Sequence, residues 1–109
     1  MDEAPILDRE RLTLITRGNA ARAESFLNAL LEESDELLAQ LRTLLPGGDR
    51  VAIGDVAHTL KGMAAEVGAA GLRAAAAALE AESEPARWAD GINAIDAALA
   101  ELRSEVTAR

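Results

Sequence analysis

Hydrophobic residues recur every three or four positions along most of the chain, which is the spacing of helices with one buried side. No segment shows the strict alternation of apolar and polar residues that is typical of a half-buried β-strand. The pattern predicts helices over residues 8–17, 19–45, 49–68 and 70–83, followed by a last helix that carries Trp88, Ile92, Ile95, Leu99, Leu102 and Val106.

Short breaks separate the predicted helices. Gly18 ends the first, Pro46-Gly47-Gly48 forms the clearest break, and Gly68 precedes the helix at 70–83. Short connections between amphipathic helices favour antiparallel neighbours. We therefore predict an all-α fold: an antiparallel up-down four-helix bundle with a short additional N-terminal helix, residues 8–17, as a lid over one end. The length of 109 residues predicts a single domain over residues 1–109.

The helix predicted at 49–68 carries the only histidine of the chain, His58. At about 100° per residue, its apolar residues share one face of the helix: Ile53, Val56, Ala57, Leu60, Ala64 and Val67. His58 lies roughly 160° from Leu60 on this wheel, so we expect its side chain to face away from the core. Its neighbours at helical spacing are Gly54, Lys61, Gly62 and Ala65.

The residues around His58 suit phosphoryl chemistry. Imidazole has an ordinary pKa of about 6.5, so a large neutral fraction is available as a nucleophile at physiological pH. Gly62 costs about 1 kcal/mol relative to alanine inside a helix, and the missing side chain would leave room beside the ring. Lys61, one turn on, could stabilise the charges of a phosphoryl group. Because no ATP-binding or kinase motif is present, the partners must supply the metal and the electrophile.

The segment His58-Thr59-Leu60-Lys61-Gly62, with Gly68 six residues further on, resembles the signature of histidine-containing phosphotransfer (HPt) domains. Such helical bundles relay a phosphoryl group between receiver-domain aspartates. The resemblance implies that His58 is the phosphoacceptor and that Lys61 and Gly62 assist it. It also implies receiver domains and a hybrid histidine kinase as partners, magnesium on the receiver, and no cofactor or metal of the chain's own. The residues expected to contact the partner are Gly54, Asp55, Ala65, Glu66 and Ala69.

Two other functions stay open from the residues alone. Glu66 stands where HPt domains commonly carry a neutral polar residue, which keeps open a non-catalytic helical adaptor that binds a receiver or kinase without accepting phosphate. A dimerising phosphotransferase resembling a histidine kinase would need a nucleotide-binding domain, for which no residues remain, so we expect a monomer. Glu80 would approach His58 if the helix at 70–83 folds back along the helix at 49–68.

The composition of the chain argues against several other classes of function and partner. The formal net charge of −8 argues against nucleic-acid and anionic-membrane partners, and the absence of cysteine excludes disulfides and thiol catalysis. A single histidine without cysteine makes zinc binding a poor hypothesis. The lone Phe26 and Trp88 are expected in the core. No run of about 18 apolar residues exists, and Met1-Asp2-Glu3 lacks the basic start of a signal peptide, so a cytoplasmic location is expected.

Overall fold

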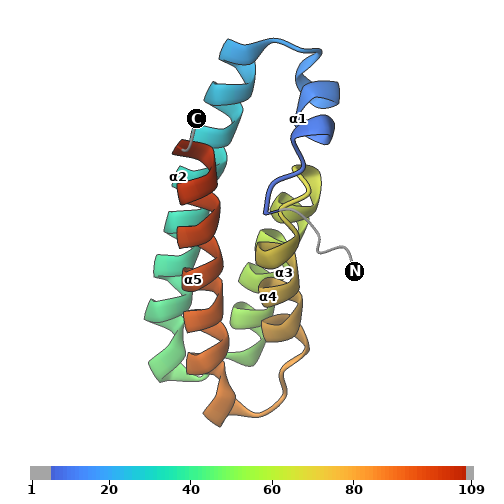
Figure 1. Cartoon of the computed structure of the whole chain (residues 1–109). Helices are drawn as coiled ribbons and strands as arrows, with labels where there is room; N and C mark the ends of the chain where they lie inside the picture. Colours follow the sequence, from blue (N-terminus) through green and yellow to red (C-terminus); the bar gives the residue numbers. More distant parts are fainter. Residues whose placement is uncertain (1–5, 108–109) are drawn as a thin grey trace.

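The computed structural model describes residues 6–107, which form five α-helices and two short 3-10 helices. The elements are α1 Arg9–Thr16, α2 Ala20–Leu44, η1 Leu45–Gly47, α3 Arg50–Glu66, α4 Ala70–Ala81, η2 Pro85–Arg87 and α5 Trp88–Thr107. Helices α2 to α5 run alternately up and down, and α1 lies at one end of the bundle (Figure 1). The predicted all-α bundle with a short additional N-terminal helix is confirmed.

Some sequence-based expectations fall partly outside this range. Residues 1–5 and 108–109 lie outside the described part of the chain. They include Met1-Asp2-Glu3, on which the expected cytoplasmic location partly rests, and both ends of the predicted domain. Within the described part of the chain, no helix is both long enough and apolar enough to cross a membrane.

Capping residues set where three of the helices begin. In each case a side-chain oxygen accepts a hydrogen bond from the backbone N–H three residues on, and the caps are Asp8, Asn19 and Asp49. Such bonds satisfy backbone donors that the first helical turn leaves free. The predicted starts therefore agree with the structure to within one residue. The ends differ slightly, since α3 stops at Glu66 rather than Gly68 and α4 stops at Ala81 rather than Ser83.

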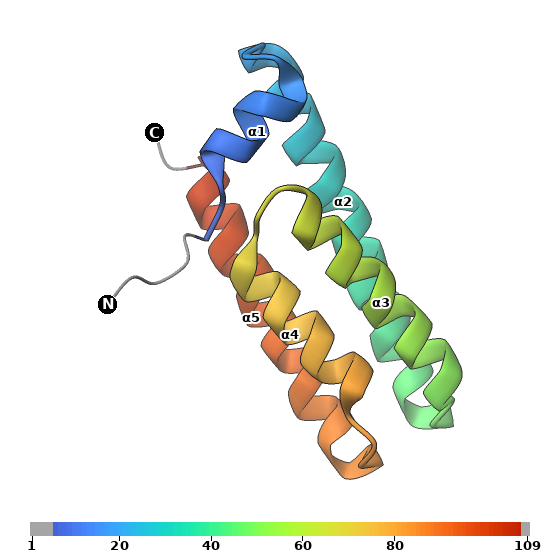
Figure 2. The same ribbon diagram turned by 90° about the vertical axis from the view of Figure 1, so that its right-hand side faces the viewer.

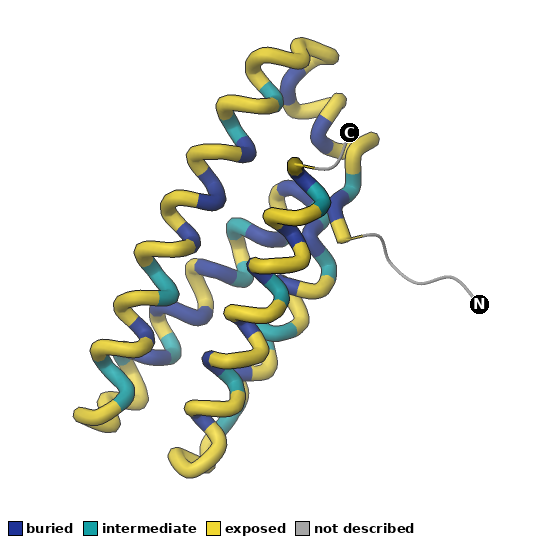
Figure 3. Tube along the Cα trace, turned by 60° about the vertical axis from the view of Figure 1, so that its left-hand side comes forward, coloured by how far each residue is buried: buried dark blue, intermediate teal, exposed yellow. Residues whose placement is uncertain are grey.

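The hydrophobic stripes of the bundle helices meet along its axis, as the buried segments in Figure 3 show. All six apolar residues predicted to share a face of α3 are buried, and so are the six predicted along α5. Trp88 is buried and Phe26 is half-buried against the same core. The sequence of the first helix predicts that Leu12 and Ile15 both point inward. Leu12 is buried, but the expectation for Ile15 is wrong, because its side chain is 46% exposed. Thr16 points inward instead, and its hydroxyl donates to the Leu12 carbonyl.

Helices α3 and α4 form the most extensive of the helix–helix contacts and lie side by side (Figure 2). Small buried residues permit this close approach; they are Ala57 and Ala64 of α3 and Ala76 of α4. Because the two helices are antiparallel, the C-terminal turns of α4 lie beside the N-terminal half of α3. This arrangement brings Glu80 next to the helix that carries His58.

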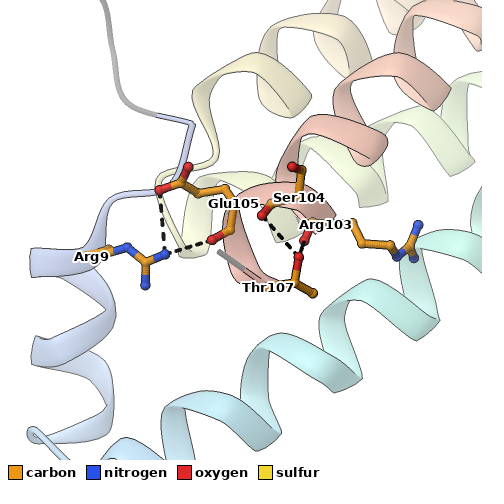
Figure 4. Close-up of polar contacts among 5 residues, drawn as sticks. All are labelled: Arg9, Arg103, Ser104, Glu105 and Thr107. Carbon is orange, nitrogen blue, oxygen red and sulfur yellow. Dashed lines mark hydrogen bonds and ion pairs between the residues drawn. The ribbon is translucent and has the colours of Figure 1, made fainter. Parts of the chain in front are cut away.

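Helix α1 is held against the end of the bundle by polar contacts to two other helices. The Arg9 guanidinium donates to the Glu105 carbonyl at 2.9 Å and lies 3.5 Å from its carboxylate (Figure 4). Arg11 Nε donates to the Glu66 carbonyl at 2.7 Å, where α3 ends. The backbone N–H of Asp8 donates to the Val67 carbonyl at 3.2 Å. The predicted lid over one end therefore exists and closes on the α3–α4 connection.

Gly68 is the position in that connection where a side chain is least tolerable. Its φ is +66°, a left-handed conformation that favours glycine, and an added Cβ would collide with the Asp8 side chain. We expect Gly68→Ala to lower the free energy of unfolding by about 2 kcal/mol, measured by urea denaturation. Gly71→Ala is the matched control, because a Cβ at position 71 meets no described atom within 4 Å. Equal stability of the Gly68 variant and the wild type would contradict the packing described for α1.

Candidate functional site

His58 lies in the middle of α3 on the face that points away from the core. Its side chain is 67% exposed, whereas its helix neighbours Ala57 and Leu60 are fully buried. The predicted outward orientation is therefore correct. The ring is open to a protein approaching along α3.

Glu80 joins His58 to Lys61. One carboxylate oxygen, Oε2, lies 2.8 Å from His58 Nδ1, and the other, Oε1, lies 2.7 Å from Lys61 Nζ. The condition stated from the sequence, that the helix of Glu80 must fold back along the helix of His58, is met. Glu80 is therefore a member of the site that the sequence pattern could name only conditionally.

Glu80 is a fixed anion at neutral pH. A hydrogen bond from Lys61, the larger cause, and one from His58 lower the pKa of its carboxyl from the ordinary value of 4.5. A carboxyl whose pKa is lowered by folding stabilises the folded state above its ordinary pKa, and this contribution disappears as the pH falls through the lowered pKa. The network thus stabilises the protein at neutral pH, and this contribution is lost as the pH falls below 4.5 and through the lowered pKa of Glu80.

The anionic Glu80 decides which tautomer His58 adopts. An ionised carboxylate can only accept hydrogen bonds, so the neutral imidazole must carry its proton on Nδ1 and donate it to Oε2. Nε2 then keeps its lone pair, and no described residue forms a hydrogen bond with it. The side chain consequently presents a nucleophilic nitrogen to solvent with its orientation fixed from behind.

Two glycines flank the ring, one turn before and one turn after it. A Cβ at Gly54 or Gly62 would meet no atom of the described structure within 4 Å. Internal packing therefore does not require either glycine, although each costs about 1 kcal/mol relative to alanine inside a helix. What they provide is a low surface on both sides of His58.

The remaining predicted contact residues divide into two groups. Gly54, Asp55 and Ala65 are at least partly exposed on α3, and Glu66 is exposed at its end. Ala69 is only 1% exposed, so the expectation that it contacts a partner is wrong. Because α3 ends at Glu66 and the chain turns at Gly68, Ala69 does not continue the exposed face of α3, and its side chain packs into the core.

A groove of about 420 Å³ opens beside His58 between α3, the end of α4 and the start of α5. Its lining comes from all three helices and includes Val51, Gly54, His58, Leu79, Glu80 and Trp88. Among residues 6–107, including those that line the groove, no three His, Cys, Asp or Glu side chains are grouped so that they could hold a metal ion.

Comparison with known proteins identifies the family. The family model described as the Hpt domain matches residues 25–105, a range that contains His58, Lys61 and Glu80. The chain belongs to the Hpt domain family. Hpt proteins serve in phosphorelays as phosphocarriers rather than kinases, and they interact with receiver domains and kinases. The chain is thus a phosphorelay histidine phosphotransfer protein.

One solved structure supports this assignment to the Hpt family. It is the crystal structure of histidine-containing phosphotransfer protein B (HptB) from Pseudomonas aeruginosa PAO1, which is 25% identical in sequence. The two structures agree with a TM-score of 0.82 over 95% of this chain and 93% of HptB. No curated protein sequence matches the chain. The Hpt likeness therefore extends to α1, which lies outside the residues matched by the family model.

Proposed function

We propose that His58 is the phosphoacceptor of this Hpt domain and carries the phosphoryl group as a covalent phosphohistidine between receiver aspartates. The observation that supports this most directly is the exposed imidazole, whose Nδ1 is engaged by Glu80 and whose Nε2 is open. Its partners in this proposal are receiver domains and a hybrid histidine kinase, which it meets as a monomer in the cytoplasm.

The phosphoryl transfer needs only the imidazole of His58 and the aspartyl phosphate of the receiver to form one bond and break one. The Nε2 lone pair attacks the phosphorus of the receiver's aspartyl phosphate in line, and the P–O bond to the aspartate breaks as the N–P bond forms. The aspartate leaves as a carboxylate, and the ring, still protonated on Nδ1, becomes a cation. Glu80, 2.8 Å from Nδ1, stabilises that developing positive charge. Reversal of the step on a second receiver releases the phosphoryl group.

Lys61 supplies positive charge at the same place. Its Nζ is bound to Glu80 Oε1 one turn from His58, and from there it can donate to a phosphoryl oxygen. Magnesium bound by the receiver would neutralise the other phosphoryl oxygens. We propose that this chain needs no cofactor of its own, because its part of the reaction is the nucleophile and its immediate charges.

The adaptor alternative is not favoured by the structure. That alternative assumed that the negative charge of Glu66 lowers the affinity of His58 for a phosphoryl group. The two residues are eight positions apart on α3, about 12 Å along the helix axis. No hydrogen bond or ion pair joins the Glu66 side chain to His58 within the described structure. Glu66 instead lies at the end of α3, where its backbone carbonyl accepts from Arg11.

Uptake of phosphate from a receiver tests the proposal. The purified protein is mixed with phosphorylated receiver domains of the source organism and run on a phosphate-affinity gel. The proposal predicts a shifted band that appears as the receiver loses its phosphate. Binding to a phosphorylated receiver without any shifted band, for every receiver, would establish the adaptor function instead.

Substitution of Gly62, one turn after His58, is expected to affect stability and activity in opposite directions. Gly62→Ala is expected to raise the free energy of unfolding by up to about 1 kcal/mol, because alanine is the better helix former and a Cβ has room. The same variant is expected to slow transfer from a receiver by about tenfold, since its methyl group, although more than 4 Å from the His58 ring, would occupy the space next to it that an incoming receiver must enter.

Denaturation and single-turnover transfer measure the two effects of this substitution. Gly71→Ala of α4 is the matched control, because it makes the same replacement away from the ring and should leave transfer unchanged. Wild-type transfer rates in the Gly62 variant would show that the gap beside His58 has no role.

A further inference from the structure

Lys61 is the only lysine of the chain, since the other ten of its eleven basic residues are arginines. A lysine amine can be converted to an amide by an acyl donor, whereas a guanidinium stays protonated and is a poor nucleophile. The chain therefore carries a single side-chain amine. Its side chain is 33% exposed, so a small molecule can reach it from solvent.

A groove of about 520 Å³ lies between α3 and α4 next to Lys61. It shares no lining residue with the groove that His58 lines. Its walls are small residues, chiefly alanines of both helices, and they also include Arg73 of α4. Arg73 is exposed, and its guanidinium forms no ion pair or hydrogen bond with any of residues 6–107. The groove thus combines an amine, a guanidinium available to an anion, and space for a small apolar group.

Glu80 provides an acceptor for a proton of the Lys61 ammonium. An ammonium has no lone pair, so it must lose a proton before it can attack an acyl group. Glu80 Oε1 lies 2.7 Å from Nζ, while the other carboxylate oxygen is engaged by His58. The amine, its proton acceptor and the groove are therefore in contact with one another.

We propose that Lys61 is an acylation site and that its donor is a small acyl phosphate, of which acetyl phosphate is the simplest. The phosphate of the donor pairs with Arg73, and the alanine-lined groove accommodates its short acyl group. A proton passes from Nζ to Glu80, and the amine attacks the carbonyl carbon. The N–C bond forms as the C–O bond to phosphate breaks. Inorganic phosphate leaves with the second amine proton, and Glu80 returns its proton to water.

Acylation of Lys61 weakens the phosphoryl site. The amide carries no charge, so the ion pair with Glu80 is lost and no ammonium remains to donate to a phosphoryl oxygen. This consequence rests on the proposed phosphoacceptor role of His58, whereas the modification itself does not. The supply of acyl phosphate thereby lowers the rate of phosphoryl transfer.

Acetyl phosphate tests the modification, with an amine introduced elsewhere as the matched control. Arg42 forms an exposed ion pair with Asp96 at 2.8 Å, so Arg42→Lys places a second amine next to a carboxylate but outside the groove. The Arg42→Lys protein is incubated with acetyl phosphate, treated with mild acid to remove any phosphohistidine, and analysed by peptide mass spectrometry. Lys61 should be acetylated about tenfold faster than the introduced lysine. Arg73→Gln should slow acetylation of Lys61 severalfold.

Three results would overturn the site. Equal acetylation of the two lysines in the Arg42→Lys protein would show adventitious surface acetylation only. An unmodified Lys61 would exclude the reaction itself, and an unchanged rate in Arg73→Gln would exclude the proposed binding of the donor. Each result is independent of the phosphoacceptor role, which phosphoramidate, a small phosphoryl donor, tests separately by labelling His58.

Transfer from a phosphorylated receiver measures the consequence of acylation. Protein synthesised with acetyl-lysine at position 61 should accept phosphate about tenfold more slowly than the unmodified protein in a single turnover. Lys61→Arg keeps the positive charge, so it should be slowed less. Equal rates for the acetylated and unmodified proteins would overturn the effect on transfer and leave the modification. Failure of the unmodified protein to accept phosphate from receivers and from phosphoramidate would overturn the phosphoacceptor role, and the effect on transfer with it.

Discussion

His58→Gln is expected to lose phosphoryl uptake completely, from receivers and from phosphoramidate alike. Glutamine approximates the size and polarity of the imidazole but offers no nucleophilic nitrogen. No second histidine exists in the chain to replace it. Because the ring is largely exposed and outside the core, the variant should remain a folded helical bundle. Radiolabel from a phosphorylated receiver measures uptake, and circular dichroism measures the fold.

Glu101→Gln provides the comparison for that experiment. Glu101 is an exposed residue of α5, so its substitution tests whether a polar surface change by itself affects transfer. It should accept phosphate as the wild type does. Label on a folded His58→Gln protein would show that another residue is the acceptor.

Glu80→Ala carries the second-largest expected effect, a ten- to hundredfold slower transfer as an order-of-magnitude estimate. The substitution removes the acceptor for Nδ1–H, the anion beside the ring that becomes positively charged, and the partner of Lys61. Glu80→Gln should be intermediate, since its amide oxygen can still accept from Nδ1–H but the negative charge is lost. Single-turnover transfer from a receiver measures both variants, with Glu101→Gln as the control for loss of one negative charge.

Glu80 is a positioning residue, so a second measurement must follow the imidazole itself. Nitrogen-15 NMR distinguishes the two neutral tautomers. The wild type should show the proton on Nδ1 and the lone pair on Nε2, whereas Glu80→Ala should show a mixture of the two. Unchanged transfer together with an unchanged tautomer in Glu80→Ala would remove Glu80 from the mechanism.

Local periodicity accounts for the parts of the structure that the sequence predicted well. Asp8, Asn19 and Asp49 cap helices through bonds to residues three positions away, so their effect is visible in the sequence. The buried face of α3 and the outward direction of His58 follow from the helical wheel alone. These features depend on neighbours within a turn or two.

The features that the sequence could not settle depend on how helices meet or end. Glu80 is 22 residues from His58, and its place beside the ring follows from the register of α4 against α3. Ala69 was expected to contact the partner, but α3 ends at Glu66 and Gly68 turns the chain, so the side chain of Ala69 packs into the core instead. Ile15 was misplaced because the short α1 contacts the bundle end with Leu12 and Thr16 rather than with its most apolar side.

The most direct test of the account is the position of the phosphorus in the phosphorylated protein. The protein is labelled with nitrogen-15, phosphorylated by a receiver, and examined by phosphorus and nitrogen NMR. One N–P bond is expected, at Nε2 of His58, with the proton retained on Nδ1 next to Glu80. Phosphorus bonded to Nδ1, or to any residue other than His58, would contradict it.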